Sequence, residues 1–154
     1  MKSFSTLALF GALFMASSAF AGVQPCYGRE KWFDFKRAEF ASSTVSKTNP
    51  IVLTIKGKPN ADLLTGESKV EFSVRQGSLR ATWESQLYNA LDGTVQQPFT
   101  KGDSTDINLR FFLPPDFKNV NSGSELQIMA KITRKAGPDY YTRVICVRGP
   151  IRIA

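Results

Sequence analysis

The side chains that could support catalysis are few, because the 154-residue chain contains no histidine and only two cysteines. Without histidine neither a Ser-His-Asp nor a Cys-His arrangement can form, and histidine-based metal sites are excluded as well. Two carboxylate pairs remain, Asp62 with Glu67 and Asp103 with Asp106, of the kind that glycosidases use. Both stand beside turn residues, which favours solvated loop carboxylates. We predict that the protein is not an enzyme and has no metal or cofactor; a small hydrolase is the alternative.

The two cysteines, Cys26 and Cys146, lie near opposite ends of the chain. An even number of cysteines in an oxidising compartment is expected to pair, and two cysteines allow only one intramolecular pairing. The sequence therefore predicts a single disulfide that joins the first strand to the last. A free thiol pair and an intermolecular bridge are the alternatives.

The first residues predict the destination of the protein. Lys2 supplies a positive charge, residues 7–14 form an apolar run, and Ala19-Phe20-Ala21 is an A-x-A cleavage signal. The run is too short to span a bilayer, which takes roughly 20 residues. We expect residues 1–21 to be a signal peptide and residues 22–154 to be one secreted domain, in the extracellular space or in an endolysosomal or vacuolar lumen. A buried N-terminal helix is the alternative.

The chain is basic, with a formal net charge of +7 that becomes +6 when the leader and its Lys2 are removed. Such a surface favours anionic lipid headgroups, acidic polysaccharide or nucleic acid, and secretion argues against nucleic acid. An evenly solvated surface with no partner is the alternative. The excess lies on Lys56, Lys58, Lys131, Arg134, Lys135, Arg143, Arg148 and Arg152.

The segments that carry these side chains are predicted to be β-strands. Short stretches alternate apolar and polar residues and are separated by turn residues, which is typical of an antiparallel sandwich or barrel. In the last stretch Val144 and Cys146 are expected to share one face. We predict an all-β, Ig-like antiparallel β-sandwich of about seven strands in one domain. The expected strands lie within 32–40, 51–56, 70–75, 79–84, 107–113, 126–132 and 140–153.

The order of parts along the chain resembles the ML domain, a family of secreted lipid-recognition proteins that includes a lysosomal cholesterol carrier and a fungal phosphatidylglycerol/phosphatidylinositol transfer protein. The resemblance covers nearly all of the mature chain and depends on layout rather than on an invariant motif. Many members carry two further disulfides that are missing here, and Pro98-Phe99 stands where a Cys-Pro element is often found. The segments that carry the resemblance are Cys26-Tyr27-Gly28, Ile55-Lys56-Gly57, Gly66, Pro98–Gly102, Leu113-Pro114, Ser124–Arg134 and Arg143–Val147.

This resemblance implies a Cys26–Cys146 disulfide and an Ig-like sandwich whose two sheets part to hold a lipid. It implies a lipid-binding or lipid-transfer protein that carries a sterol, fatty acid or phospholipid without covalent chemistry. We expect a monomer that makes transient contact with anionic membranes. An ordinary closed core is the alternative for each expected lining residue. These residues are Phe72, Val74, Trp83, Leu109, Phe111, Ile128 and Ile132.

A second hypothesis is a secreted Ig-like interaction module that binds a protein or glycan through its loops. Such a module would have a solid core and an exposed aromatic patch. The candidates for that patch are Trp32, Phe117, Tyr140 and Tyr141.

Overall fold

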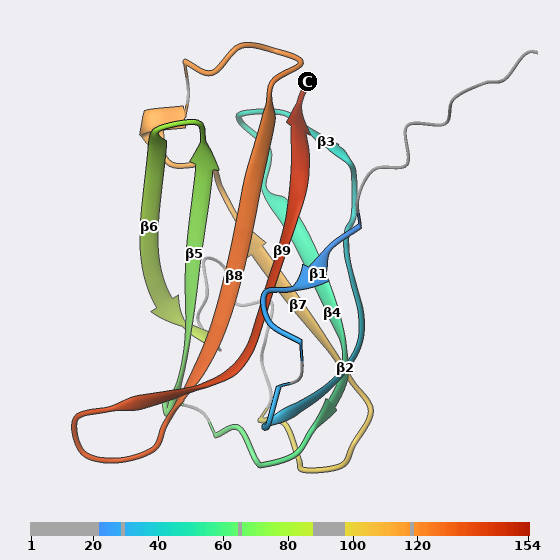
Figure 1. Cartoon of the computed structure of the whole chain (residues 1–154), viewed down its shortest axis with the longest axis vertical. Helices are drawn as coiled ribbons and strands as arrows, with labels where there is room; N and C mark the ends of the chain where they lie inside the picture. Colours follow the sequence, from blue (N-terminus) through green and yellow to red (C-terminus); the bar gives the residue numbers. More distant parts are fainter. Residues whose placement is uncertain (1–21, 29, 65, 88–97, 118) are drawn as a thin grey trace, which may run out of the picture.

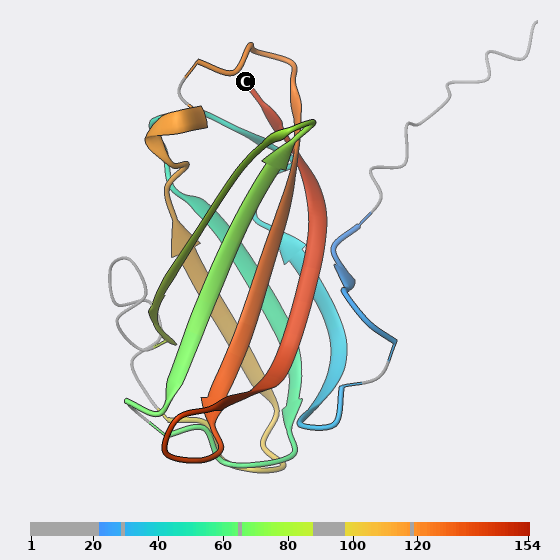
Figure 2. The ribbon, with the colours of Figure 1, turned by 60° about the vertical axis from the view of Figure 1, so that its left-hand side comes forward.

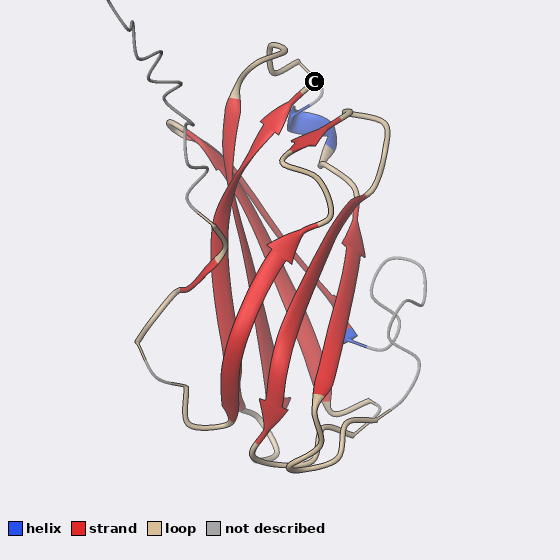
Figure 3. Cartoon of the chain, turned by 90° about the vertical axis from the view of Figure 1, so that its right-hand side faces the viewer, coloured by secondary structure: helices blue, strands red, loops and turns tan. Residues whose placement is uncertain are grey.

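The computed structural model describes residues 22–28, 30–64, 66–87, 98–117 and 119–154, so the predicted signal peptide lies outside the described residues. Within these ranges the chain forms nine strands and the short 3-10 helix η2 (Pro115–Phe117). Figure 3 shows how fully strands dominate the fold. None of the described helices has the length and apolarity needed to cross a lipid bilayer. The strands are β1 (Gln24–Pro25), β2 (Phe33–Phe40), β3 (Thr44–Val45), β4 (Ile51–Pro59), β5 (Ser68–Gln76), β6 (Leu79–Gln86), β7 (Thr105–Phe111), β8 (Glu125–Lys135) and β9 (Tyr141–Ile153).

The strands form two layers. One sheet has the order β1-β9-β8-β5-β6, with β3 added to the end of β9, and the other has the order β2-β4-β7. Only the β3–β9 pair is parallel among the described strands. Figures 1 and 2 show the larger sheet lying across the smaller one. The prediction of an all-β antiparallel sandwich is confirmed; the two additional strands, β1 and β3, are only two residues long.

Alternation along the strands builds the core between the two sheets. In β4 the side chains of Ile51, Leu53 and Ile55 are buried, and the residues between them are half-buried. The paired strand β7 buries Ile107 and Leu109 on the same face. Each side chain of this kind stabilises the fold by about 1.5–3 kcal/mol relative to an exposed position, so pattern and burial together fix which face points inward.

Gly57 allows β2 and β4 to approach closely. A Cβ atom at this position would overlap the Phe33 ring and the Asp34 carbonyl oxygen. The β2–β4 register shifts nearby, between Phe35 and Arg37. Only glycine therefore fits here, and its absent side chain leaves room for the buried Phe33 in the core.

The prediction that Val144 and Cys146 share a face of an alternating last strand is wrong. The β8–β9 register shifts between Ile132 and Thr133, and Val144 is the extra residue on β9. Beyond this bulge Ile145 lies opposite Ile132 and faces the core. The Cys146 side chain points away from the core, and its disulfide to Cys26 shields it from solvent. Residues 144–147 are consequently all buried, which hides the alternation.

The Cys26–Cys146 disulfide closes one side of the sandwich. Its S–S distance is 2.00 Å, and the Cys26 amide also donates to the Cys146 carbonyl oxygen at 2.8 Å. Just before β1, Val23 forms an isolated bridge with Ala38 of β2. The predicted pairing is confirmed, and the N-terminal segment contacts both sheets along the β2/β9 side.

Candidate functional site

All seven of the residues expected to line a lipid site lie on the inner faces of the two sheets. Phe72 and Val74 of β5, Trp83 of β6, and Ile128 and Ile132 of β8 come from the larger sheet, and Leu109 and Phe111 of β7 come from the smaller one. Six of these side chains are at most 1% exposed, and only Trp83 is half-buried. The structure thus brings them into one interior region.

An aromatic cluster joins the two sheets within this region. The Phe72 ring stacks on the Phe111 ring, with 4.4 Å between centroids and 29° between planes. Trp83 lies 5.6 Å from Phe72 and 6.1 Å from Phe111. Such contacts contribute about 0.5–1.5 kcal/mol beyond the area that they bury. Because Trp83 is half-buried, the cluster extends from the centre of the interior to the protein surface.

The cluster lies between two edge strands that belong to different sheets. β6 is an edge of the larger sheet and β7 is an edge of the smaller one, and these two strands are not paired in the described structure. The contacts of Phe111 with Phe72 and Trp83 bring the two edges together through side chains. The opposite side carries the disulfide and the bridge to β2.

Backbone hydrogen bonds, and not a disulfide, fasten the loop that begins at Pro98. Phe99 and Leu63 exchange two backbone hydrogen bonds, of 3.0 and 3.2 Å. Leu63 is buried and Phe99 packs against the core. Where many ML domains have a Cys-Pro element, this chain therefore holds the loop by a β-bridge and apolar packing.

Few buried side chains could take part in covalent chemistry. Among the described residues the buried polar side chains are Glu30, Ser68 and Ser73. Glu30 accepts a hydrogen bond from Arg143 Nε at 3.0 Å, which compensates its charge. The described acidic and cysteine side chains form no cluster able to hold a metal ion.

One carboxylate of each candidate catalytic pair has a structural partner. Asp62 accepts a hydrogen bond from the Lys101 amide at 2.8 Å and so fastens a loop. Asp106 forms an ion pair with Lys56 of 3.0 Å across the β4–β7 ladder. These contacts account for both side chains without a substrate.

The expected aromatic patch is wrong at Phe117. This residue ends the turn that begins at the Pro114 carbonyl, and its side chain is fully buried in the core. It also lies at the end of the sandwich opposite the β8–β9 turn that carries Tyr140 and Tyr141 (Figure 1). Those two tyrosines are exposed, and Trp32 is half-buried.

The sequence did not reveal that basic side chains cover aromatic rings around this β8–β9 turn. A cation over an aromatic face is attracted by the ring quadrupole, and the arrangement keeps aromatic and basic groups on one surface. Except for Lys31 and Trp32, which are neighbours in sequence, the paired residues come from segments distant in sequence, so no local motif predicts them. We call these residues the lower-end surface. The pairs are Lys31 over Trp32 at 4.8 Å, Arg134 over Trp32 at 5.0 Å, Lys69 over Tyr141 at 4.5 Å and Arg143 over Tyr27 at 3.9 Å.

Comparison with known proteins identifies the fold. No protein-family model and no curated protein sequence matches the chain. Among solved structures, a Niemann-Pick type C2 protein from the Japanese carpenter ant is similar, with a TM-score of 0.58 and 13% identity over 85% of this chain and 98% of that one. The C-terminal domain of wzt is similar with a TM-score of 0.53 and 9% identity over 86% of this chain and 77% of that one. The chain therefore has the fold of a Niemann-Pick type C2 protein, which confirms the expected resemblance to the ML domain at the level of the fold.

Proposed function

We propose that this protein is a secreted lipid-binding or lipid-transfer protein, which holds a sterol, fatty acid or phospholipid between its two sheets. The observation that carries the proposal is the aromatic cluster of Phe72, Trp83 and Phe111, which reaches the surface between two unpaired sheet edges. The fold shared with a Niemann-Pick type C2 protein supports it. The disulfide supports a secretory route, to the outside or to an endolysosomal or vacuolar lumen.

The energetics favour an apolar ligand in this region. Separating the sheets exposes apolar side chains, which costs about 25 cal/mol for each Å². A lipid tail that enters between β6 and β7 covers the same side chains and recovers that cost. The described interior has few polar groups to orient a hydrophilic ligand, so the affinity comes from burial. The function proposed here involves binding and release without bond cleavage.

Under this proposal each protein chain binds one lipid molecule. Native mass spectrometry of the secreted protein is expected to show one bound lipid per chain, and organic extraction then identifies its class. Trp83→Ala removes the ring at the surface end of the cluster and is expected to lower lipid occupancy about tenfold or more, because a buried aromatic contributes about 1.5–3 kcal/mol.

Trp32→Ala is the matched control, since Trp32 is also half-buried but lies on the lower-end surface. It is expected to retain the lipid. Protein that carries no lipid and takes up no fluorescent lipid would contradict the proposed function, and equal losses in both tryptophan variants would contradict the assignment of the site.

We further propose that the lower-end surface makes transient contact with anionic membranes during loading or release. Basic side chains near an anionic bilayer contribute about 1 kcal/mol each, and tyrosine and tryptophan favour the membrane interface. The exposed Tyr140 and Tyr141 stand beside the basic residues here. The triple variant Lys31→Gln/Lys69→Gln/Arg134→Gln is expected to reduce co-sedimentation with vesicles containing phosphatidylglycerol at least tenfold. Binding that is unchanged, or equally strong to neutral vesicles, would refute this surface.

A further inference from the structure

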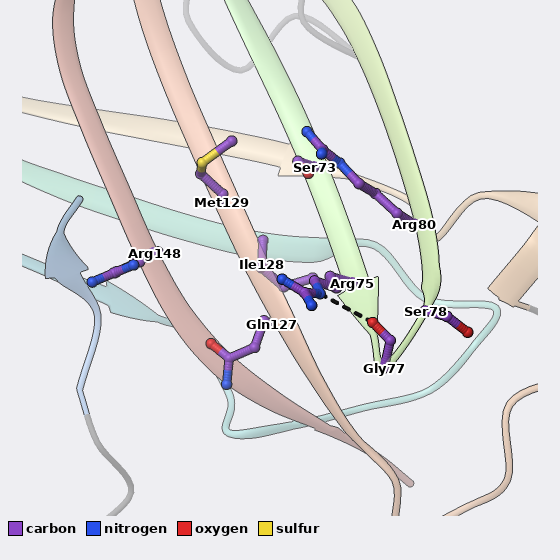
Figure 4. Close-up of a pocket in the computed structure, with 9 residues that line it drawn as sticks. All are labelled: Ser73, Arg75, Gly77, Ser78, Arg80, Gln127, Ile128, Met129 and Arg148. Carbon is purple, nitrogen blue, oxygen red and sulfur yellow. Dashed lines mark hydrogen bonds between the residues drawn. The ribbon is translucent and has the colours of Figure 1, made fainter.

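A basic groove lies on the outer face of the larger sheet, away from the apolar interior. Its volume is about 580 Å³, and it crosses β5, β6, β8 and β9 below the turn between β5 and β6. Figure 4 shows three arginines around it, one each from β5, β6 and β9. The polar side chains that line it include Arg75, Arg80, Arg148, Ser73, Ser78 and Gln127.

The strand register places like charges side by side in this groove. Arg75 of β5 is the direct cross-strand partner of Arg80 of β6, and Gln127 of β8 is opposite Arg75 on the other side. In the next row along the sheet, Arg148 of β9 is opposite Met129 of β8. Like charges directly opposite on paired strands destabilise a sheet, so the free protein carries an unfavourable interaction here.

The same face of the sheet shows how its charges are normally compensated. Closer to the lower end, Lys131 pairs with Glu71 at 2.8 Å and Lys69 with Glu84 at 3.9 Å. No carboxylate lines the groove. In the described part of the chain, none of the ion pairs includes an arginine of the groove.

One of the three arginines is held in place by a hydrogen bond. Arg75 Nε donates to the Gly77 carbonyl oxygen at 3.0 Å, which holds its guanidinium against the turn (Figure 4). Gln127 donates to Glu125 at 3.3 Å and keeps its amide oxygen free to accept a hydrogen bond from a ligand. The groove thus offers three cations, of which Arg75 is positioned, that have no carboxylate partner among the described residues.

The size of the groove and the residues that line it indicate which kind of anion it binds. Arg80 on β6 and Arg148 on β9 are separated by two strands and by one row along the sheet, which places their backbones about 16 Å apart at the usual strand spacing and rise. That distance exceeds the reach of one small ion and fits an extended chain with repeated negative charges. A bilayer would meet apolar or aromatic side chains at its interface, whereas the apolar side chain that this groove offers is the half-buried Met129, since Ile128 points into the core.

We infer that this groove binds an acidic polysaccharide. The guanidinium groups hold its carboxylate or sulfate groups, for which their planar fork is suited, and Ser78 and Gln127 reach its hydroxyl groups. The site is separate from the proposed lipid site, because the groove lies on the outer face of the sheet whose inner face carries Phe72 and Trp83.

The test compares two triple variants of the full secreted protein that each remove three positive charges. Binding of a heparin oligosaccharide and of polygalacturonate is measured by titration calorimetry at low and at physiological salt. Arg75→Gln/Arg80→Gln/Arg148→Gln is expected to weaken binding of at least one of these ligands about a thousandfold, because three charge-assisted contacts of roughly tenfold each are lost. Lys31→Gln/Lys69→Gln/Arg134→Gln is the matched control and is expected to lose less than threefold.

Equal losses in the two variants would overturn the inference, because net charge alone would then explain binding. It would also be overturned if the groove variant loses binding to anionic vesicles or to an oligonucleotide while neither polysaccharide binds the wild type. Arg80→Gln gives an independent readout in the absence of ligand. It relieves the repulsion with Arg75 and is expected to raise the thermal midpoint by a few degrees at low salt. A lowered midpoint with unchanged binding would assign Arg80 a structural role instead.

Discussion

Phe111→Asp is expected to leave a folded protein that carries no lipid. Phe111 is the residue of the smaller sheet that completes the aromatic cluster, and it is fully buried against Phe72. A carboxylate here stands in the path of an apolar ligand, and its desolvation opposes closure of the sheets around a lipid. The free energy of unfolding should fall by about 3–5 kcal/mol, from the lost ring and the buried charge. Native mass spectrometry reports the occupancy, and near-ultraviolet circular dichroism reports the fold.

Two controls separate loss of the site from loss of stability. Phe111→Leu keeps an apolar side chain and is expected to retain most of the lipid. Ile153→Asp places the same charge at a buried position at the end of β9. It is expected to destabilise the protein to a similar degree while the lipid stays bound. Lipid that remains bound to a folded Phe111→Asp protein would remove the cluster from the site.

Loss of the disulfide is expected to produce a large fall in the free energy of unfolding. Cys26 and Cys146 are 120 residues apart, so the bond closes a loop that contains nearly the whole domain. The chain-entropy model credits such a loop with about 5 kcal/mol, and strain usually lowers the measured value. The variant Cys26→Ser/Cys146→Ser should therefore lose about 3–5 kcal/mol of unfolding free energy in a denaturant titration. β1 would then keep only its backbone bonds to β9.

Reductant provides the internal check for this prediction. It should shift the unfolding midpoint of the wild type toward that of the double variant and leave the double variant unchanged. A wild-type midpoint that does not respond to reductant under denaturing conditions would show that the bond contributes nothing measurable.

The apolar core of the fold follows from the local pattern of the sequence. The apolar stripes of β4, β5, β7 and β8 alternate in the sequence, and burial follows them except at Ser73 of β5, which is also buried, so the inner faces were predicted correctly. The cysteine pair was also predictable, because two cysteines permit a single intramolecular bond. These features depend only on residue type and spacing along one strand.

Features that depend on contacts between distant segments were not predictable in this way. β1 and β3 contain two residues each, too few for a period, and exist only because β9 offers them an edge. Phe117 was expected at the surface, but the turn at Pro114 directs it into the core. The opposition of Arg75 and Arg80 requires the strand register, which no single strand encodes. The candidate site was predicted as a set of apolar residues, and its aromatic geometry was not.

The different construction of the two sides of the sandwich determines how it can deform. On the β2/β9 side the N-terminal segment is bonded to β9 through the Cys26–Cys146 disulfide and to β2 through the Val23–Ala38 bridge, so it connects the two sheets. On the other side, β6 and β7 are not paired with each other within the described residues, and Phe111 contacts Phe72 and Trp83 through side chains. Amide hydrogen exchange is therefore expected to be faster in the edge strands β6 and β7 than in β8 and β9, which lie inside the larger sheet.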